Sequence, residues 1–256
     1  MTGPVSLAAI TAYLDQYLRI GDIPDEANAL NGLQVQNRSG QVGRIVAAVD
    51  ASFATIEGAG RGPAMLLVHH GLFWDGNVPL IGRRYRRVTG LFDGDLALYS
   101  AHIPLDVHAE VGNNHELARR TGLAELQPFD LYRGIPIGVQ GILEAEMPRE
   151  AFVARVEHVL GTSARLIPGG PSLVRRVGII TGGAGDRIPA AVRAGLDIYV
   201  TGEGPHHTYF DATELGVNAV FAGHYATETL GVKALAEHLS IRFGIPWEFH
   251  DHPTGL

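Results

Sequence analysis

Three segments of the chain place histidine and acidic side chains directly after apolar runs. The candidate metal donors are His69 and His70 in "LLVHHG", His102 and Asp106 in "SAHIPLD", and His224 and Glu228 in "AGHYATE". Imidazole nitrogens and carboxylate oxygens are ligands that suit Zn, Mn, Fe, Co and Ni. The chain has no cysteine, so thiolate metal sites, thiol catalysis and disulfides are excluded. The pattern therefore indicates a metal site built from nitrogen and oxygen donors.

The spacing of these donors favours two neighbouring ions. His224 and Glu228 are four residues apart, so they share one face of a helix. His69 and His70 would point to opposite sides in a regular strand. At the exit of a strand, with Gly71 free to take unusual dihedrals, both imidazoles can reach one cavity. Two divalent ions about 3.5–4 Å apart activate water and clamp phosphoryl or amide oxygens.

Structural roles are the alternative for each of these residues. A single histidine at a strand end is more often structural than a ligand, and the metal hypothesis depends on three segments agreeing. "TGGAG" (181–185) could cradle a phosphate, but a tight turn is favoured. "RRYRR" (83–87) could attract an anionic substrate, but a solvated helix face is favoured. The remaining helical or C-terminal histidines are interpreted as structural or surface residues: His115, His158, His238, His250 and His252.

The first half of the chain must supply strands that position these donors. Leu7, Ile10, Leu14 and Leu18 recur at helical spacing behind a Ser6 cap. Apolar runs predict strands over 44–52, 64–70 and 96–102. Helices are expected over 53–59, 83–95 and 113–123, the last capped by Asn113 or Asn114.

The second half repeats this plan, which indicates a weak internal duplication. Strands are expected over 137–143, 175–181, 197–204, 217–223 and 245–252, and helices over 148–160, 188–196, 208–216 and 224–240. Strands buried on both faces that alternate with helices are typical of α/β proteins with largely parallel or mixed sheets. The first lobe is predicted to be residues 1–126 plus 222–256 and the second 127–221, with the metal site at the cleft between them.

Composition narrows the function classes. The chain has 256 residues, 46% hydrophobic residues and 33 glycines, as in globular proteins. The net charge of -7 gives no electrostatic reason for nucleic-acid binding. The N-terminal residues lack the pattern of a signal peptide, and no apolar run reaches the length of a membrane span. A cytoplasmic protein that does not bind membranes is the expectation.

Five segments taken together resemble the Nif-three-like family, whose bacterial members are often named GTP cyclohydrolase I type 2 homologue or dinuclear metal centre protein. The segments are "NGLQV", "VHHGLFW", "YSAHIPLD", "VTGEGPHH" and "FAGHYATE", within about residues 28 to 235. The resemblance implies two α/β lobes related by a pseudo-repeat. It also implies a site for two divalent transition-metal ions and a toroidal homo-hexamer.

The resemblance also assigns roles to individual residues. The residues that match the family's metal ligands are His69, His70, Asp106, His224 and Glu228. His102 matches a site histidine close to the metals, and His207 matches a histidine that lines the cavity. Glu203 stands where relatives commonly have aspartate, and "NGLQVQN" departs from the usual glycine after the valine.

Two classes of function follow. The leading hypothesis is a metal-dependent hydrolase of a small phosphorylated or nucleotide-like substrate, in which His102 or His207 moves a proton. The alternative is a metal-binding, storage or delivery protein, or a regulatory scaffold, without turnover. An open coordination position distinguishes a catalytic metal site from a closed one.

Overall fold

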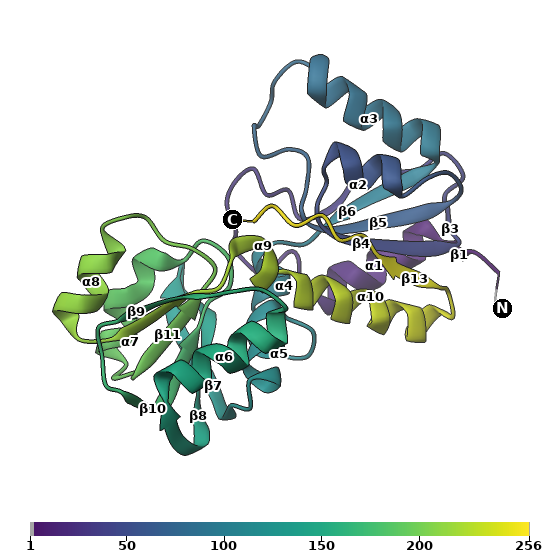
Figure 1. Cartoon of the computed structure of the whole chain (residues 1–256). Coiled ribbons are helices and arrows are strands. Elements are labelled where there is room, and N and C mark those ends of the chain that lie inside the picture. Colours follow the sequence, from purple (N-terminus) through teal and green to yellow (C-terminus); the bar gives the residue numbers. More distant parts are fainter. Residues whose placement is uncertain (1–2, 256) are drawn as a thin grey trace. The chain divides into compact units, whose positions relative to one another are not determined.

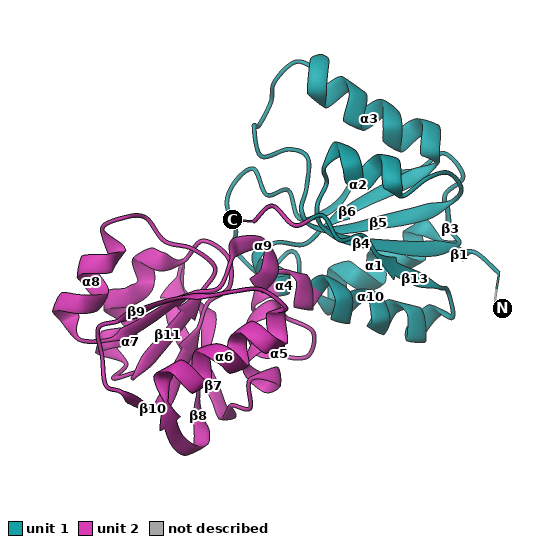
Figure 2. Cartoon of the chain, in the orientation of Figure 1, with its two compact units in different colours: residues 1–105, 232–252 teal, residues 106–231, 253–256 magenta. Residues whose placement is uncertain are grey.

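The computed structural model describes residues 3–255, and the chain divides into two compact units (Figure 2). Unit 1 comprises the chain up to Leu105 together with Val232–His252, and unit 2 comprises Asp106–Gly231 and the residues from Pro253 onwards. These divisions differ from the predicted ones after residues 126 and 221. The first difference arises because Leu117, in the helix over 113–120, packs into a core of unit 2, and the second because Leu230 packs into the same core.

Unit 1 is built around a five-stranded sheet with the order β13-β4-β5-β6-β2 (Figure 1). The first four strands are parallel, and β2 pairs antiparallel with β6 at the edge. The strands and helices are β1 (Val5–Ser6), α1 (Leu7–Tyr17), β2 (Gly32–Val35), β3 (Gln41–Val42), β4 (Arg44–Asp50), α2 (Phe53–Gly58), β5 (Ala64–His70), α3 (Gly82–Gly94), β6 (Leu96–Ser100), α4 (Ile103–Asp106), α10 (Thr229–Phe243) and β13 (Trp247–Phe249).

Alternating side chains of unit 1 pack on opposite faces of its sheet. Val46, Leu66 and Val68 belong to a core with Ile56 and Leu91, which come from α2 and α3. Helices α1 and α10 lie on the other face in Figure 1. Because both faces are covered, the three central strands consist almost entirely of apolar residues, as the sequence predicted.

Unit 2 has a six-stranded mixed sheet with the order β7-β8-β10-β11-β12-β9. Strands β10, β11 and β12 are parallel, and β8 and β9 flank them in antiparallel pairing. The elements are α5 (Asn113–Arg120), β7 (Ala124–Tyr132), β8 (Ile135–Pro148), α6 (Arg149–Leu160), β9 (Arg165–Pro168), β10 (Leu173–Ile179), η1 (Gly185–Arg187), α7 (Ile188–Arg193), β11 (Ile198–Thr201), α8 (Thr208–Leu215), β12 (Asn218–Phe221) and α9 (His224–Thr227).

Two cores cover the two faces of this sheet. Leu117 of α5 and Phe152 of α6 pack with Val200 on one face. Ala191 of α7 and Ala212 of α8 pack with Tyr199 on the other. Neighbouring residues of β11 therefore enter opposite cores, which is the alternation expected of a central strand.

Both units contain the same run of three sequential parallel strands joined by helices. In unit 1 the run is β4-α2-β5-α3-β6, and in unit 2 it is β10-α7-β11-α8-β12. The predicted α/β class with largely parallel and mixed sheets is confirmed. Among residues 3–255, no helix is both long and apolar enough to cross a membrane.

Candidate metal site

Three histidines of unit 1 come together at the carboxyl ends of β5 and β6. One ring nitrogen of each of His69, His70 and His102 lies within 4.8 Å of the others. The His69 and His70 ring centroids are 4.8 Å apart, and the His69 and His102 centroids are 5.0 Å apart. This spacing could accommodate a metal ion. His102, assigned by sequence to either ligation or proton transfer, thus lies among the candidate ligands.

Hydrogen bonds fix which nitrogen of each ring faces this cluster. His69 Nδ1 is 2.8 Å from the carbonyl oxygen of Ala101, so Nδ1 must carry the proton. His70 Nδ1 is 2.9 Å from Asp50 Oδ1, and His102 Nδ1 is 2.8 Å from Asp25 Oδ1. An acceptor at Nδ1 places the lone pair of the neutral ring on Nε2. The same arrangement orients metal-binding histidines in proteins.

The carboxylate behind His102 is itself held firmly. Asp25 is almost fully buried beside that ring and also accepts bonds from Asn31 Nδ2 at 2.8 Å and the backbone N–H of Ile103 at 3.0 Å. Burial acts to raise the pKa of Asp25, but the hydrogen bond and charge of His102, with donors from Asn31 and Glu26, hold it below the usual range. Asp25 therefore stays ionised and fixes the orientation of the His102 ring.

Gly71 matters for space rather than for an unusual backbone angle. Its φ is not in the left-handed region, contrary to the expectation from the sequence. A Cβ atom on Gly71 would lie 2.2 Å from the Gln34 side chain. That side chain accepts a hydrogen bond from the N–H of Leu72 at 2.8 Å. The absence of a side chain thus lets Gln34 hold the segment that leaves the two histidines.

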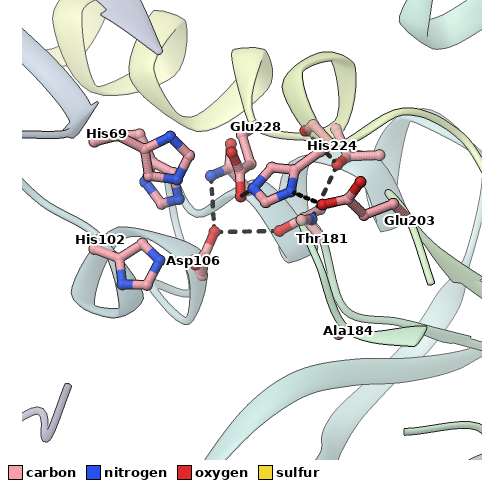
Figure 3. Close-up of polar contacts among 12 residues, drawn as sticks. His69, His102, Asp106, Thr181, Ala184, Glu203, His224 and Glu228 are labelled. Carbon is pink, nitrogen blue, oxygen red and sulfur yellow. Dashed lines mark hydrogen bonds and ion pairs between the residues drawn. The ribbon is translucent and has the colours of Figure 1, made fainter. Parts of the chain in front are cut away.

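A second set of donors lies within unit 2, around Asp106. Asn113 Nδ2 donates to Asp106 Oδ1 at 2.8 Å, and the Thr181 hydroxyl lies 3.2 Å from the same oxygen (Figure 3). Thr181 follows β10, and Asn113 begins α5. These two donors fix the orientation of the carboxylate, which suits a ligand better than a surface charge.

The asparagines expected to cap α5 have another role. Gly112 is the residue before α5, and no side chain caps the start of this helix. Asn113 Oδ1 instead accepts from the N–H of Gly231 at 2.6 Å. Asn114 accepts from the N–H of Thr181 at 2.8 Å and donates to the carbonyl of Ile137. Both side chains are fully buried, so the backbone around Asp106 and Thr181 depends on them.

His224 lies between two carboxylates of unit 2 (Figure 3). Its Nδ1 is 2.7 Å from Glu203 Oε1, and its Nε2 is 3.2 Å from Glu228 Oε1. The hydrogen bond to Glu228 raises the pKa of His224 to about 9, burial opposes this, and Glu203 adds to it. A metal ion at Nε2 would take the position where the proton meets Glu228. Glu203, whose role the sequence left in doubt, is the partner of Nδ1.

The approach of Glu228 depends on Gly182. This glycine has φ near +70°, and a Cβ atom here would lie 2.3 Å from Glu228 Oε1. The N–H of Gly182 donates to the Thr227 hydroxyl at 3.0 Å, and its carbonyl accepts from the N–H of Gly202. The ends of β10, β11 and β12 are thereby joined. "TGGAG" is a turn that makes room for a carboxylate.

His207 stands apart from both donor sets. It is the residue before α8, and its side chain is exposed. Among the described residues, it belongs to neither group of clustered donors. Its assignment as a catalytic residue stays a prediction. The acceptors Asp25 and Asp50 were not identified as part of the site from sequence, although Asp50 lies near the end of a predicted strand.

Fold and site together define an α/β protein with clustered imidazole and carboxylate donors that could bind metal. The model of one family, Duf34/NIF3 (NGG1p interacting factor 3), matches residues 5–253. The chain belongs to the DUF34/NIF3 family.

Relatives match along the whole chain. A protein from Deinococcus radiodurans named "GTP cyclohydrolase 1 type 2 homolog" is 45% identical over 256 residues, covering 99% of this chain and 96% of that protein. The structure of TTHA1606 from Thermus thermophilus superposes with a TM-score of 0.87 at 41% identity, covering 98% of this chain and all of that one. Protein ybgI, described as of unknown function, gives a TM-score of 0.91 at 34% identity over the same shares.

Proposed function

We propose that this protein is a metal-dependent hydrolase with a dinuclear centre, acting on a small phosphorylated or nucleotide-like substrate. The observation that carries the proposal is the set of acceptors on Nδ1. His69, His70, His102 and His224 all have this nitrogen bonded to an oxygen, which makes Nε2 the atom that faces a cation or, in His102, exchanges a proton. Acceptors of this kind are found behind the histidines of metal sites. The name shared by curated relatives supports a nucleotide-like substrate.

The donor chemistry fits a pair of divalent transition-metal ions. In the proposal, His69 and His70 hold metal from unit 1, and Asp106, His224 and Glu228 hold metal from unit 2. Nitrogen and oxygen donors without sulfur suit Zn, Mn, Fe, Co or Ni. Bound ions would supply the Lewis acidity that activates water near neutral pH.

The protein's own groups perform the proton transfers. His102 has its Nδ1 bonded to the ionised Asp25, so its Nε2 is the atom that accepts or returns a proton. Asp25 then stabilises the positive ring while it carries that proton. The second proposed proton carrier, His207, is exposed.

Metal analysis and an activity screen test the proposal together. Protein purified without added metal or chelator should contain close to two equivalents of a transition metal per chain. Loaded protein should hydrolyse nucleotides or phosphoesters, Asp106→Ala should abolish this, and the exposed Asp186→Ala should not. If the protein contains metal but turns over no substrate, the storage, delivery or scaffold alternative would be favoured over the hydrolase. A protein that contains no metal and takes up none on titration would rule out both functions.

A further inference from the structure

A pocket of about 350 Å³ lies within unit 2, and none of the donors discussed so far lines it. Its walls come from the segment after β11, the first turn of α8, the last residue of β12 and strand β9. The lining residues used below are Arg165, His206, Tyr209, Phe210 and Phe221. Small-molecule sites in proteins commonly have volumes from about 300 to 1,000 Å³, so this pocket can accept a single ring system.

Four of the nine lining residues carry aromatic rings. His206 and Phe210 pack edge to face with centroids 5.8 Å apart, and Tyr209 and Phe210 do the same at 5.5 Å. Tyr209 is 45% exposed and Phe210 is 48% exposed, although apolar rings of this size are usually covered. Rings held at right angles to one another leave flat faces accessible, and a planar heterocycle stacks on such faces.

The pocket carries one cation and no acidic residue. Arg165 pairs with Phe221 across β9 and β12, and its side chain is exposed. Among residues 3–255, no carboxylate forms an ion pair with Arg165, although the whole chain is acidic overall. A guanidinium group without a counter-charge, at the edge of an apolar pocket, suits a phosphate or carboxylate group.

The pocket lies at the functional end of its sheet. Phe221 is the last residue of β12, and the lining residue Gly204 directly follows Glu203, the partner of His224. Open α/β sheets bind ligands beyond the carboxyl ends of parallel strands. Residues at the carboxyl ends of β11 and β12 thus contribute both to the metal donors and to the pocket of unit 2.

We infer that this pocket binds a planar aromatic ring that carries an anionic group. Tyr209 stacks on the ring, Phe210 contacts its edge, and Arg165 pairs with the anion. The inference rests on the proposed function in one respect: it assigns the pocket to the ring of the hydrolase's nucleotide-like substrate.

Titration calorimetry on the full chain tests the pocket without metal. Chelator-treated protein is titrated at low salt with GMP, guanosine and ribose 5-phosphate, which present ring and anion, ring alone, and anion alone. GMP should bind most tightly. Arg165→Gln should weaken GMP binding by about three- to tenfold and leave guanosine unchanged. Tyr209→Ala should weaken both by about fivefold or more.

Two matched variants control for general effects. Arg193→Gln removes an equally exposed arginine from α7, and Leu215→Ala truncates a side chain of α8 with 47% exposure outside the pocket. Neither should change the affinity for GMP. Equal losses in Arg165→Gln and Arg193→Gln would show only general charge attraction and overturn the assignment. Absence of GMP binding, with Tyr209→Ala but not Leu215→Ala lowering the native mass, would show that a second copy covers the pocket.

The experiments can reject the proposed ligand of the pocket and the proposed hydrolase function independently. GMP binding with the expected variant effects, in a protein that hydrolyses nothing, would keep the pocket and reject the hydrolase. Turnover of a nucleotide with the same KM in wild type and Arg165→Gln would keep the hydrolase and reject the pocket. An increase in KM without a change in kcat in Arg165→Gln would support both.

Discussion

The two units use one strand-helix plan to present different donors. Unit 1 presents three imidazoles at the ends of β5 and β6, with carboxylates behind the rings of His70 and His102. Unit 2 presents one imidazole after β12, with Glu228 against its Nε2 and Asp106 nearby in the same unit's network. Unit 1 thus offers neutral ligands, and unit 2 offers anionic ones. The fold determines the positions of the donors, and the residue types at the strand ends determine their charge.

This difference has an electrostatic consequence. Anionic donors beside a dication offset its charge directly, whereas carboxylates behind imidazoles act through the ring. We therefore expect the carboxylates of unit 2 to offset the charge of a bound ion. The imidazoles of unit 1 should determine which metal is preferred.

The largest expected effect is from removing an imidazole of unit 1. His69 is fully buried and belongs to the cluster of candidate donors. His69→Ala should lower metal affinity by at least about a hundredfold. Loss of a direct ligand should cost at least as much as loss of a hydrogen-bond partner behind a ligand, which costs up to about a hundredfold. Competition with a fluorescent chelator measures this, and exposed His158→Ala is the control. An unchanged affinity would remove His69 from the site, and complete unfolding would make its role structural.

The acceptors behind the rings should have smaller and unequal effects. Asp25 is 6% exposed and Asp50 is 38% exposed, so solvent can replace Asp50 more easily. Asp50→Asn should lower metal affinity by less than about tenfold, because water can partly replace the carboxylate behind the ligand His70. Asp25→Asn should lower kcat by about tenfold or more with little change in metal affinity, because Asp25 stabilises the protonated His102 ring. The competition measurement and the activity assay compare the two variants, and a larger loss of metal affinity for Asp25→Asn would make His102 a metal ligand.

The metal-free protein should show a pH effect that belongs to unit 2 alone. The folded-state pKa of His224 is raised from 6.5 to about 9. A raised pKa stabilises the folded state fully below the unfolded value, and this stabilisation is lost as pH rises through the folded value. Chelator-treated protein should therefore lose stability between pH 6.5 and 9, measured by urea unfolding. His224→Gln should remove that slope and His158→Gln should not; equal slopes would reject the carboxylate pairing.

The smallest effect is spectroscopic and reports on unit 1 alone. The Trp74 ring lies 4.9 Å from His102 and 6.0 Å from His70, edge to face with both. The chain has two tryptophans, so Trp247→Phe leaves Trp74 as the only one. A transition metal at these histidines should change its fluorescence. No change on metal uptake in Trp247→Phe would place the metal away from unit 1.

Sequence predicts most of the fold and the candidate donors, because both follow from local patterns. Apolar runs located β4, β5, β6 and β10, and the helix from Phe53 ends at Gly58 as expected within a residue. The donors His69, His102 and His224 were recognisable because a polar residue after a buried strand lies at a sheet's functional end.

What sequence could not supply depends on contacts between distant residues. Asp25 contacts His102, which is 77 residues away in the sequence, and Glu203 contacts His224, which is 21 residues away. Strands β7 and β9 alternate poorly because they lie at the edges of their sheet, so no periodic pattern identified them. Asn113 and Asn114 were interpreted as caps because their type favours caps, but burial gives them other partners.

The discontinuity of unit 1 affects how the chain is made on the ribosome. Unit 2 is continuous from Asp106 to Gly231, so its sheet can close before the C-terminal segment is translated. Strand β4 gains its outer neighbour only when Trp247–Phe249 emerges. Until then, unit 1 carries an unpaired apolar strand edge, which is a template for aggregation. Nascent chains that stop short of this segment should therefore depend on chaperones.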